Sequence, residues 1–253
     1  MFIDTHAHLY YDDLKSQLDD IVTRVQDAGV NQILCVGTDI ALSKASIIIA
    51  DQYPDIYATV GIHPHDAKDA ETNYLSVIED LISHPKVVAL GEMGLDFSRN
   101  LSPKEIQIKM FTAQLQLAKK LNLPAIIHNR DADEDILKIL REINYQKTVI
   151  HCFSSDAKMA ADVLKLGGLI SFTGIVTFGK NHTESVLKSI SLEDFILETD
   201  CPFLAPVPNR GKLNEPANIP HIAKRIAEIK NVELEEIAKV TTHNTKQFFN
   251  LPS

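Results

Sequence analysis

The sequence of 253 residues has no tryptophan, only three cysteines and no long hydrophobic run. Because the cysteines form no CxxC pair, the chain lacks the spacing of a zinc finger, and we expect reduced thiols. The apolar stretch at residues 45–50 is far too short to cross a bilayer, and the first residues contain neither a basic segment nor an apolar signal core. We therefore expect a cytoplasmic protein without membrane association.

Positive charge is also in short supply. Lysine and arginine number 25 against 34 aspartates and glutamates, which gives a formal net charge of −9 with histidine neutral. This balance argues against a general polyanion binder covered in basic residues. It leaves a nuclease open, because bound divalent cations and a few arginines can make a single cleft locally positive.

What the chain does have is a regular alternation of short apolar runs with longer segments of helical spacing. Candidate strands occupy residues 1–5, 32–37, 56–61, 87–91, 125–128, 148–151, 169–172 and 195–198. Apolar runs of this length between turn residues are typical of buried parallel strands. Eight of them alternating with helices predict an α/β fold, a (β/α)8 TIM barrel in which residues 1–253 form a single domain. An open doubly wound sheet is the alternative that strand counting does not separate.

Helical spacing is clearest in four segments, at residues 14–28, 103–121, 156–166 and 233–249. The second follows a capping-box pattern at Ser102, with Pro103 at the first helical position. The third ends at Gly167 and Gly168, which are typical of a helix stop.

Histidines and carboxylates stand at the ends of the predicted strands. The positions are His6 and His8 after the first strand, His63 and His65 after the third, Glu92 after the fourth, His128 after the fifth, His151 after the sixth and Asp200 after the eighth. Any one of them alone is more often a hydrogen-bonded core or surface residue. Barrel enzymes, however, carry their catalytic residues at the C-terminal ends of strands, where a closed barrel aims them at one point. Imidazoles mixed with carboxylates suit Zn²⁺, Mn²⁺ or Mg²⁺.

Two cysteines directly follow residues of this set. Cys152 comes after His151, and Cys201 comes after Asp200. Neighbouring side chains of an extended chain point to opposite faces, so we interpret both cysteines as packing residues.

The motifs around these residues resemble those of the TatD family of metal-dependent deoxyribonucleases. They are residues 5–9 (THAHL), 61–65 (GIHPH), 91–96 (GEMGLD), 127–128 (IH), 130–132 (RDA), 151–153 (HCF), 198–202 (ETDCP) and 210–216 (RGKLNEP). Their order and spacing agree from Asp4 to the last predicted helix. The resemblance implies a barrel of the amidohydrolase-like superfamily, and it covers essentially the whole chain.

The resemblance also implies a cofactor of two divalent metal ions, with zinc, manganese and magnesium all open. One ion would be held by His6, His8, Glu92 and Asp200. The second would be held by Glu92, His128 and His151, so that Glu92 bridges. Glu92 and Asp200 would be catalytic, Asp200 by orienting or deprotonating the attacking water.

The substrate implied by the resemblance is DNA, single-stranded or at frayed ends, cleaved at its phosphodiesters in the manner of a 3′-5′ exonuclease. The positions that match the surroundings of the substrate phosphates are His63, His65, Arg130, Arg210, Asn214 and Glu215. Phe203 stands where many family members have tyrosine, which puts sequence preference rather than hydrolysis in doubt. We expect a monomer.

Three alternatives stay open at this point. The same barrel and ligands suit hydrolysis of another bond, such as an amide, an ester or an acyl group on RNA. A module that binds metal or nucleic acid without turnover is a second alternative. For Arg130, the alternative to a phosphate contact is an ion pair with Asp131 or Asp133.

Overall fold

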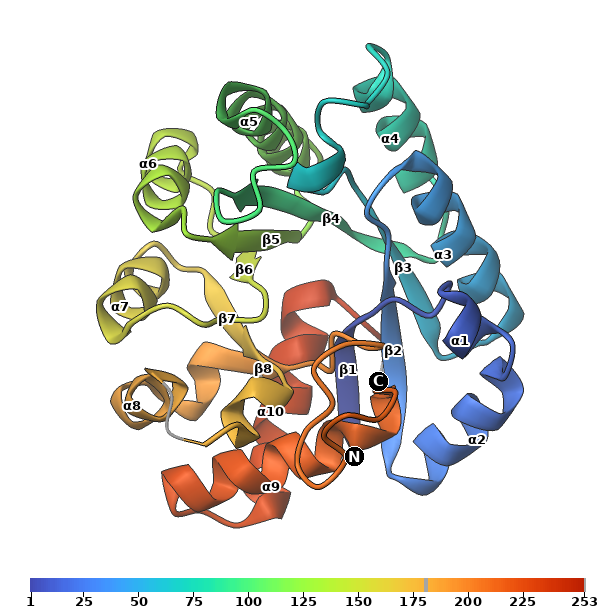
Figure 1. The fold of residues 1–253 in the computed structure, drawn as a ribbon, viewed down its shortest axis with the longest axis vertical. Coiled ribbons are helices and arrows are strands. Elements are labelled where there is room, and N and C mark those ends of the chain that lie inside the picture. The colour runs from blue at the N-terminus through green and yellow to red at the C-terminus, as the bar shows by residue number, and fades with distance from the viewer. Residues whose placement is uncertain (180–181, 253) are drawn as a thin grey trace.

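Eight strands run parallel, each hydrogen-bonded to the next along the chain. They are β1 (Phe2–Ala7), β2 (Val30–Val36), β3 (Ile56–Val60), β4 (Val87–Asp96), β5 (Ala125–Arg130), β6 (Thr148–Ile150), β7 (Leu169–Phe172) and β8 (Phe195–Leu197). This computed structural model describes residues 1–179 and 182–252. Just beyond β8, Cys201 bridges back to Ala7 in parallel, and the amide of Asp200 donates to the carbonyl of His6 at 2.9 Å. The sheet therefore closes as a (β/α)8 barrel, which confirms the predicted fold, and the open doubly wound sheet is wrong (Figure 1).

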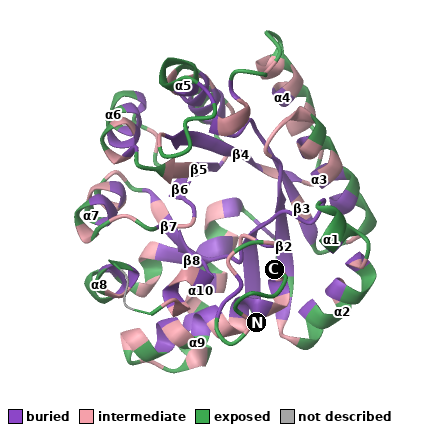
Figure 2. Cartoon of the chain, viewed as in Figure 1, coloured by how far each residue is buried: buried purple, intermediate pink, exposed green. Residues whose placement is uncertain are grey.

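Helices surround the barrel between the strands. They are α1 (Asp12–Lys15), α2 (Leu18–Asp27), α3 (Ile40–Gln52), α4 (Tyr74–Ile82), α5 (Lys104–Leu121), α6 (Asp133–Ile143), α7 (Ala157–Lys165), α8 (His182–Ser189), α9 (Ile219–Lys230) and α10 (Leu234–Phe249), with short 3₁₀ turns η1 (Pro64–Asp66), η2 (Gly174–Thr177), η3 (Leu192–Asp194) and η4 (Pro216–Asn218). Figure 2 shows that they are buried along the faces toward the strands and exposed on the outside. Within the described ranges, no helix has the length and apolar composition needed to cross a bilayer.

One of the four predicted helices and one predicted cap differ from the structure. The segment 14–28 is not one helix, because Gln17 leaves helical geometry at φ −130° and ψ 30° and separates α1 from α2. The capping box at Ser102 is also wrong. The Ser102 hydroxyl donates to the carbonyl of His65 at 2.7 Å, and α5 begins at Lys104 after Pro103. The bounds of the other three predicted helices are confirmed to within a residue by α5, α7 and α10.

Strand β4 is longer than predicted and lies unusually close to β5. A Cβ atom on Gly94, at φ 147°, would collide with the carbonyl oxygen of His128, so only glycine allows this approach. The pairing of β4 with β5 continues to Asp96 and Arg130. As a result, Glu92 lies within β4, close to the residues that end β5.

The interior of the barrel is packed and sealed at one end. Side chains from six strands form an apolar cluster there: Ile3, Leu34, Val36, Ala89, Ile126, Val149 and Ile196. Phe249 and Leu251 pack onto this cluster from the end of α10, which passes behind the strands in the view of Figure 1. The barrel is therefore a filled core rather than a pore, and its polar residues gather at the opposite end.

Candidate metal centre

The side chains predicted as metal ligands meet at the C-terminal end of the barrel. They are His6 and His8 at the end of β1, Glu92 in β4, His128 in β5, and His151 and Asp200 just after β6 and β8. Within this set, ligand atoms of His6, His8 and Glu92 lie within 4.8 Å of one another, as do those of His6, His151 and Asp200. The parallel strands bring them together because all eight end on the same side.

Glu92 stands at the centre of the cluster, and its two carboxylate oxygens face different histidines. Oε2 lies 3.4 Å from Nε2 of His6 and 3.9 Å from Nε2 of His8. Oε1 lies 2.8 Å from Nδ1 of His128 and 2.9 Å from Nε2 of His151. Glu92 therefore divides the histidines into two groups, one at each oxygen.

Asp200 joins the first of these groups. Its Oδ1 atom lies 3.4 Å from Nε2 of His8 and 3.9 Å from Nε2 of His6. Its backbone is in the left-handed region at φ 55°, a conformation that a residue with a Cβ rarely adopts. The hydrogen bond from its amide to the carbonyl of His6 helps to hold this conformation and thus the direction of the carboxylate.

His63 and His65 lie beside the second group. Nε2 of His63 is 3.3 Å from Oε1 of Glu92. Burial lowers the pKa of His63 to about 4, outweighing the attraction of Glu92, so its imidazole is neutral at neutral pH and offers a lone pair. His65 instead faces Asp96, with Nε2 2.7 Å from Oδ2.

The cluster concentrates negative charge in a buried place. Burial by itself raises the pKa of Glu92, but the positive charge of His151 and hydrogen bonds from His128 and His151 hold it well below its usual value. Within the described part of the chain, the ion pairs of Glu92, Asp96 and Asp200 are all with histidines. The balancing charge must come from protons on those histidines or from bound cations.

A further layer of polar residues contacts the cluster from behind. Glu198 lies with Oε1 3.5 Å from Nδ1 of His151 and Oε2 3.9 Å from Nδ1 of His6. The hydroxyl of Tyr10 lies 2.8 Å from Nδ1 of His8. Metal-binding histidines commonly have such a partner on the second ring nitrogen, which fixes the ring orientation.

Sequence reasoning assigned no role to Glu198 or to Asp96, whose Oδ2 atom lies 3.4 Å from Nε2 of His128. Both lie in the matched motifs, Asp96 at the end of β4 and Glu198 directly after β8. This position at a strand end could have marked them as functional residues. Both are almost fully buried.

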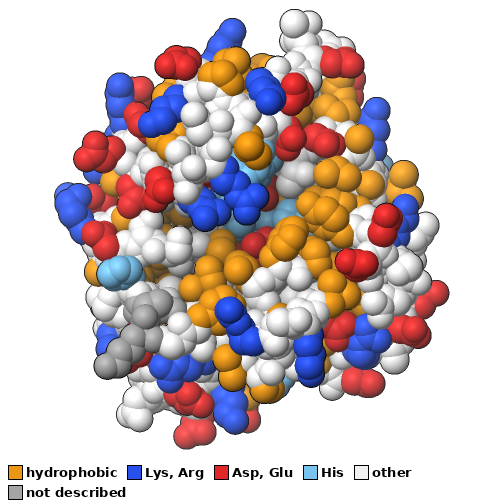
Figure 3. All heavy atoms as spheres, viewed as in Figure 1, with side chains coloured by type: hydrophobic (Ala, Val, Ile, Leu, Met, Phe, Trp, Pro, Cys, Tyr) orange, Lys and Arg blue, Asp and Glu red, His pale blue; other side chains and the backbone are white. Residues whose placement is uncertain are grey.

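The cluster lies at the bottom of a cavity of about 640 Å³. Figure 3 shows this hollow at the centre of one face of the molecule, with histidine and acidic side chains at its bottom. His63, His65 and Arg130 line it, so these three predicted contacts are in reach of a bound molecule. Cys152 lines it as well, because a φ of 47° turns the chain out of extended geometry, and the prediction that it only packs is wrong. Cys201 is fully buried, as predicted.

The other predicted contacts lie elsewhere. Asn214 is fully buried and donates to the carbonyls of Thr199 and Phe203, so it cannot touch a substrate. Glu215 is bound by Arg24, with Nη2 2.6 Å from Oε2, and is outside the lining of the cavity. The full burial of Asn214 contradicts its predicted contact, whereas a contact of Glu215 with a substrate stays a prediction.

The two arginines of the prediction have different surroundings. The guanidinium of Arg210 lies 3.6 Å from the ring centre of Phe178, outside the lining of the cavity, and its contact with phosphate stays a prediction. Arg130 lines the cavity. The carboxylate of Asp133 accepts instead from Asn129 at 2.6 Å and from Ser155 at 2.9 Å. Neither Asp133 nor Asp131 forms an ion pair with Arg130 in residues 1–179 and 182–252.

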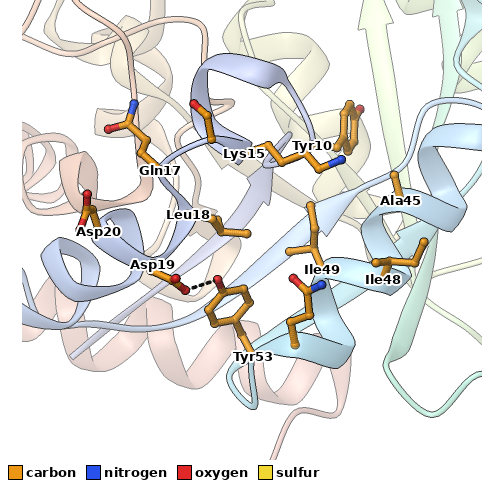
Figure 4. Close-up of a pocket in the computed structure, with 12 residues that line it drawn as sticks. Tyr10, Lys15, Gln17, Leu18, Asp19, Asp20, Ala45, Ile48, Ile49 and Tyr53 are labelled. Atoms are coloured by element: carbon orange, nitrogen blue, oxygen red, sulfur yellow. Dashed lines mark hydrogen bonds between the residues drawn. The ribbon is translucent and has the colours of Figure 1, made fainter.

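A second hollow lies on the outside of the barrel between α2 and α3 (Figure 4). Its wall includes Lys15, Asp19 and Tyr53, and the Tyr53 hydroxyl donates to Asp19 at 2.5 Å. Of the described residues grouped closely enough to hold a metal ion, none lines this hollow. Among the described residues, the groups able to hold a metal ion are therefore those at the mouth of the barrel.

A parallel barrel that gathers imidazoles around one buried glutamate defines a class, the metal-dependent hydrolases. The family within that class follows from the sequence: the model of the family described as "TatD related DNase" matches residues 3–250. The chain belongs to this family, which confirms the resemblance found in its motifs.

Individual relatives match over nearly their whole length. YabD of Bacillus subtilis (strain 168), named an uncharacterized metal-dependent hydrolase, is 42% identical over 254 residues, covering 99% of this chain and 100% of the relative. The 3′-5′ ssDNA/RNA exonuclease TatD of Shigella flexneri is 36% identical, covering 92% of this chain and 93% of the relative. The crystal structure of YjjV, a TatD homologue from Escherichia coli K12, superposes with a TM-score of 0.94 at 29% identity, covering 99% and 98% of the two chains.

Proposed function

We propose that this chain is a metal-dependent 3′-5′ deoxyribonuclease that hydrolyses phosphodiesters at single-stranded or frayed DNA ends. The observation that carries the proposal is the division of the histidines between the two oxygens of Glu92, which is the arrangement that a pair of bridged cations needs. The name of the Shigella relative supports the bond and the polarity.

The residues fit two ions. Nε2 of His6 and Nε2 of His8 lie only 3.3 Å apart and face Glu92 and Asp200, so one cation shared among the four would relieve the crowding of lone pairs. Glu92, His128 and His151 would hold the second ion, and His63 is close enough to join them. The mixture of imidazole and carboxylate suits zinc, manganese or magnesium.

Divalent ions in these two places would lower the pKa of a water molecule and polarise the scissile phosphoryl group. Asp200 is our candidate to orient that water and accept its proton. Burial raises the pKa of Asp200, but a hydrogen bond from His8 and the charges of His6 and His151 outweigh burial and lower it. The carboxylate is therefore ionised at neutral pH and able to accept a proton. Arg130 on the wall of the cavity would pair with a non-bridging phosphate oxygen through its planar fork.

The experiment is digestion of end-labelled single-stranded DNA by protein of measured metal content. We expect release of mononucleotides from the 3′ end by metal-loaded protein and none after chelation. Glu92→Gln should bind less metal and lose at least about 100-fold in rate, because both groups of histidines lose their shared ligand. Glu79→Gln, the same substitution at an exposed glutamate paired with Lys120, is the matched control and should leave the rate unchanged.

The same samples should be offered an acyl ester and an amide substrate. Metal-loaded protein that leaves DNA intact but hydrolyses one of these would refute the nuclease and favour a hydrolase of another bond. Metal-loaded protein that protects DNA without cleaving any substrate would favour a binding module. A Glu92→Gln protein with wild-type activity would refute the bridging role.

A further inference from the structure

The cavity above the cluster has two unlike rims. Figure 3 shows basic side chains along one edge of the hollow and hydrophobic side chains along the opposite edge. The basic lining residues are Arg99 and Arg130, from the ends of β4 and β5. The hydrophobic ones are Tyr11, Ile175, Phe203 and Leu204, which follow β1, β7 and β8. In an eight-stranded barrel, β4 and β5 stand across from β8 and β1, so the two rims face each other over the metal centre.

The hydrophobic rim exposes two aromatic rings, whereas the other phenylalanines and tyrosines are buried or half-buried. The chain has ten phenylalanines and six tyrosines. Among the large hydrophobic side chains that the structure finds exposed, the aromatic ones are Tyr11 and Phe203, at 41% and 49%. Both are in the lining of this cavity. Exposed aromatic side chains clustered in a concave surface often mark a binding site.

These two rings adjoin the proposed metal ligands. Their centres lie 5.7 Å apart in an edge-to-face arrangement. The ring of His8 lies 6.1 Å from Tyr11 and 6.4 Å from Phe203, centre to centre. A group attached one sugar away from a phosphate at the cluster would therefore reach the aromatic pair.

The opposite rim carries positive charge from Arg99 and Arg130. The ion pairs found in the described ranges include neither Arg99 nor Arg130, and both side chains are exposed. Further phosphates of a bound strand would meet these guanidinium groups. Removal of one terminal nucleotide places a single nucleoside on one side of the scissile phosphate and the rest of the phosphate backbone on the other. The hydrophobic rim suits the base of the terminal nucleoside, and the basic rim suits the phosphate backbone.

We propose that Tyr11 and Phe203 form a stacking surface for the unpaired 3′-terminal base of a DNA strand, while Arg99 and Arg130 bind the phosphates that precede it. This assignment rests on the proposed function and explains how the enzyme would select its DNA substrate. A base that is still paired cannot offer its face to the rings, so the surface selects single-stranded ends.

The test compares two metal-loaded reactions on oligonucleotides that differ only at the 3′ end, one ending in thymidine and the other in an abasic tetrahydrofuran residue. Stacking on aromatic side chains predicts that the wild-type protein removes the thymidine with a kcat/KM about 5- to 100-fold higher. In Phe203→Ala and Tyr11→Ala that preference should fall toward one, through KM. Phe203→Tyr keeps a ring and should keep the preference. Val207→Ala, which trims an exposed side chain on the same loop away from the cavity lining, is the matched control.

Each outcome decides something. Wild-type protein that removes both ends at equal rates would overturn the stacking surface and leave the nuclease standing. A preference that survives in folded Phe203→Ala and Tyr11→Ala proteins would overturn it too. Metal-loaded protein that leaves both oligonucleotides intact would overturn the proposed function, and the stacking surface with it. Because both rings are exposed, the melting temperatures of the variants should remain close to wild type, which separates loss of binding from loss of fold.

Discussion

The carboxylate of Glu198 lies behind the ring of His151, with Oε1 3.5 Å from Nδ1, while Nε2 on the other side of that ring lies 2.9 Å from Glu92. The same carboxylate reaches toward His6, at 3.9 Å from Nδ1. It is therefore in contact with one histidine from each of the two groups that Glu92 separates. Glu198 itself is held by the amide of Cys152, which donates to Oε1 at 2.6 Å.

We predict that Glu198→Gln weakens metal binding by about 10- to 100-fold, because an amide orients and polarises the two imidazoles less well than a carboxylate does. Metal titration of the purified protein measures the change, and activity at saturating metal should recover in part. Glu193→Gln, at an exposed residue in η3, serves as control. Wild-type metal affinity in Glu198→Gln would refute the positioning role.

Removal of the metal should make stability depend on pH in a defined direction. In the metal-free protein, burial lowers the pKa of His151, but the carboxylates of Glu92 and Glu198 outweigh it and hold the pKa well above the usual 6.5. A proton on His151 therefore stabilises the metal-free fold, fully below about pH 6.5, and this contribution is lost as the pH rises toward the raised pKa. The loss is at most about 1.4 kcal/mol per pH unit for one proton.

Bound metal requires the neutral imidazole, so the stabilisation that metal provides should grow between about pH 6 and about pH 8. The measurement is the difference in melting temperature between metal-loaded and chelator-treated protein at several pH values. A difference that stays constant or shrinks as the pH rises would contradict the assignment of His151 as a ligand.

The two arginines near the mouth should differ in their salt dependence. We predict that Arg130→Gln raises KM for single-stranded DNA and lowers the slope of log affinity against log salt by about 0.7, the value for one lost phosphate contact. Arg210→Gln should have a smaller effect, because that guanidinium lies over the ring of Phe178. Steady-state kinetics over a range of salt concentrations test both. Equal slopes for wild type and Arg130→Gln would show that Arg130 meets no phosphate.

Glu215 should matter for stability rather than for binding. Its carboxylate is held by the Nε and Nη2 atoms of Arg24, which ties the loop after β8 to α2. Because this pair is partly exposed, Glu215→Gln should reduce the free energy of unfolding by no more than about 1 kcal/mol and leave KM unchanged. Chemical denaturation measures the free energy of unfolding, and steady-state kinetics on the same sample measures KM. A raised KM at unchanged stability would restore Glu215 to the substrate site.

The sequence was sufficient to predict the barrel and the residues that gather at its mouth. Strand ends are visible as the points where apolar runs stop, and closure of the barrel brings those points together wherever they fall in the chain. His6, Glu92 and His128 could therefore be predicted as neighbours although they come from three different strands. The undivided helix over residues 14–28 and the cap at Ser102 were wrong, because Gln17 leaves helical geometry and the Ser102 hydroxyl donates to His65, outside the helix that follows it.

What could not be predicted depends on contacts between distant parts of the chain. Glu215 pairs with Arg24, which is 191 residues away, and no local pattern reveals that choice. In the sequence Asn214 resembles an exposed loop residue, but in the structure its side-chain amide donates to two backbone carbonyls. Cys152 faces the cavity only because its backbone is left-handed, and that conformation has no marker in the residue type.

Phe249 and Leu251 pack at the far end of the barrel interior, so the cavity over the metal centre does not continue through the barrel as a channel. A DNA strand therefore cannot pass through the barrel from one end to the other. If the protein is the exonuclease proposed above, a mononucleotide released at the bottom of the cavity would have to leave on the side from which the strand entered. Each round of cleavage would thus alternate with retreat of the product, which makes the exit of the mononucleotide a natural candidate for the slow step and favours distributive over processive digestion.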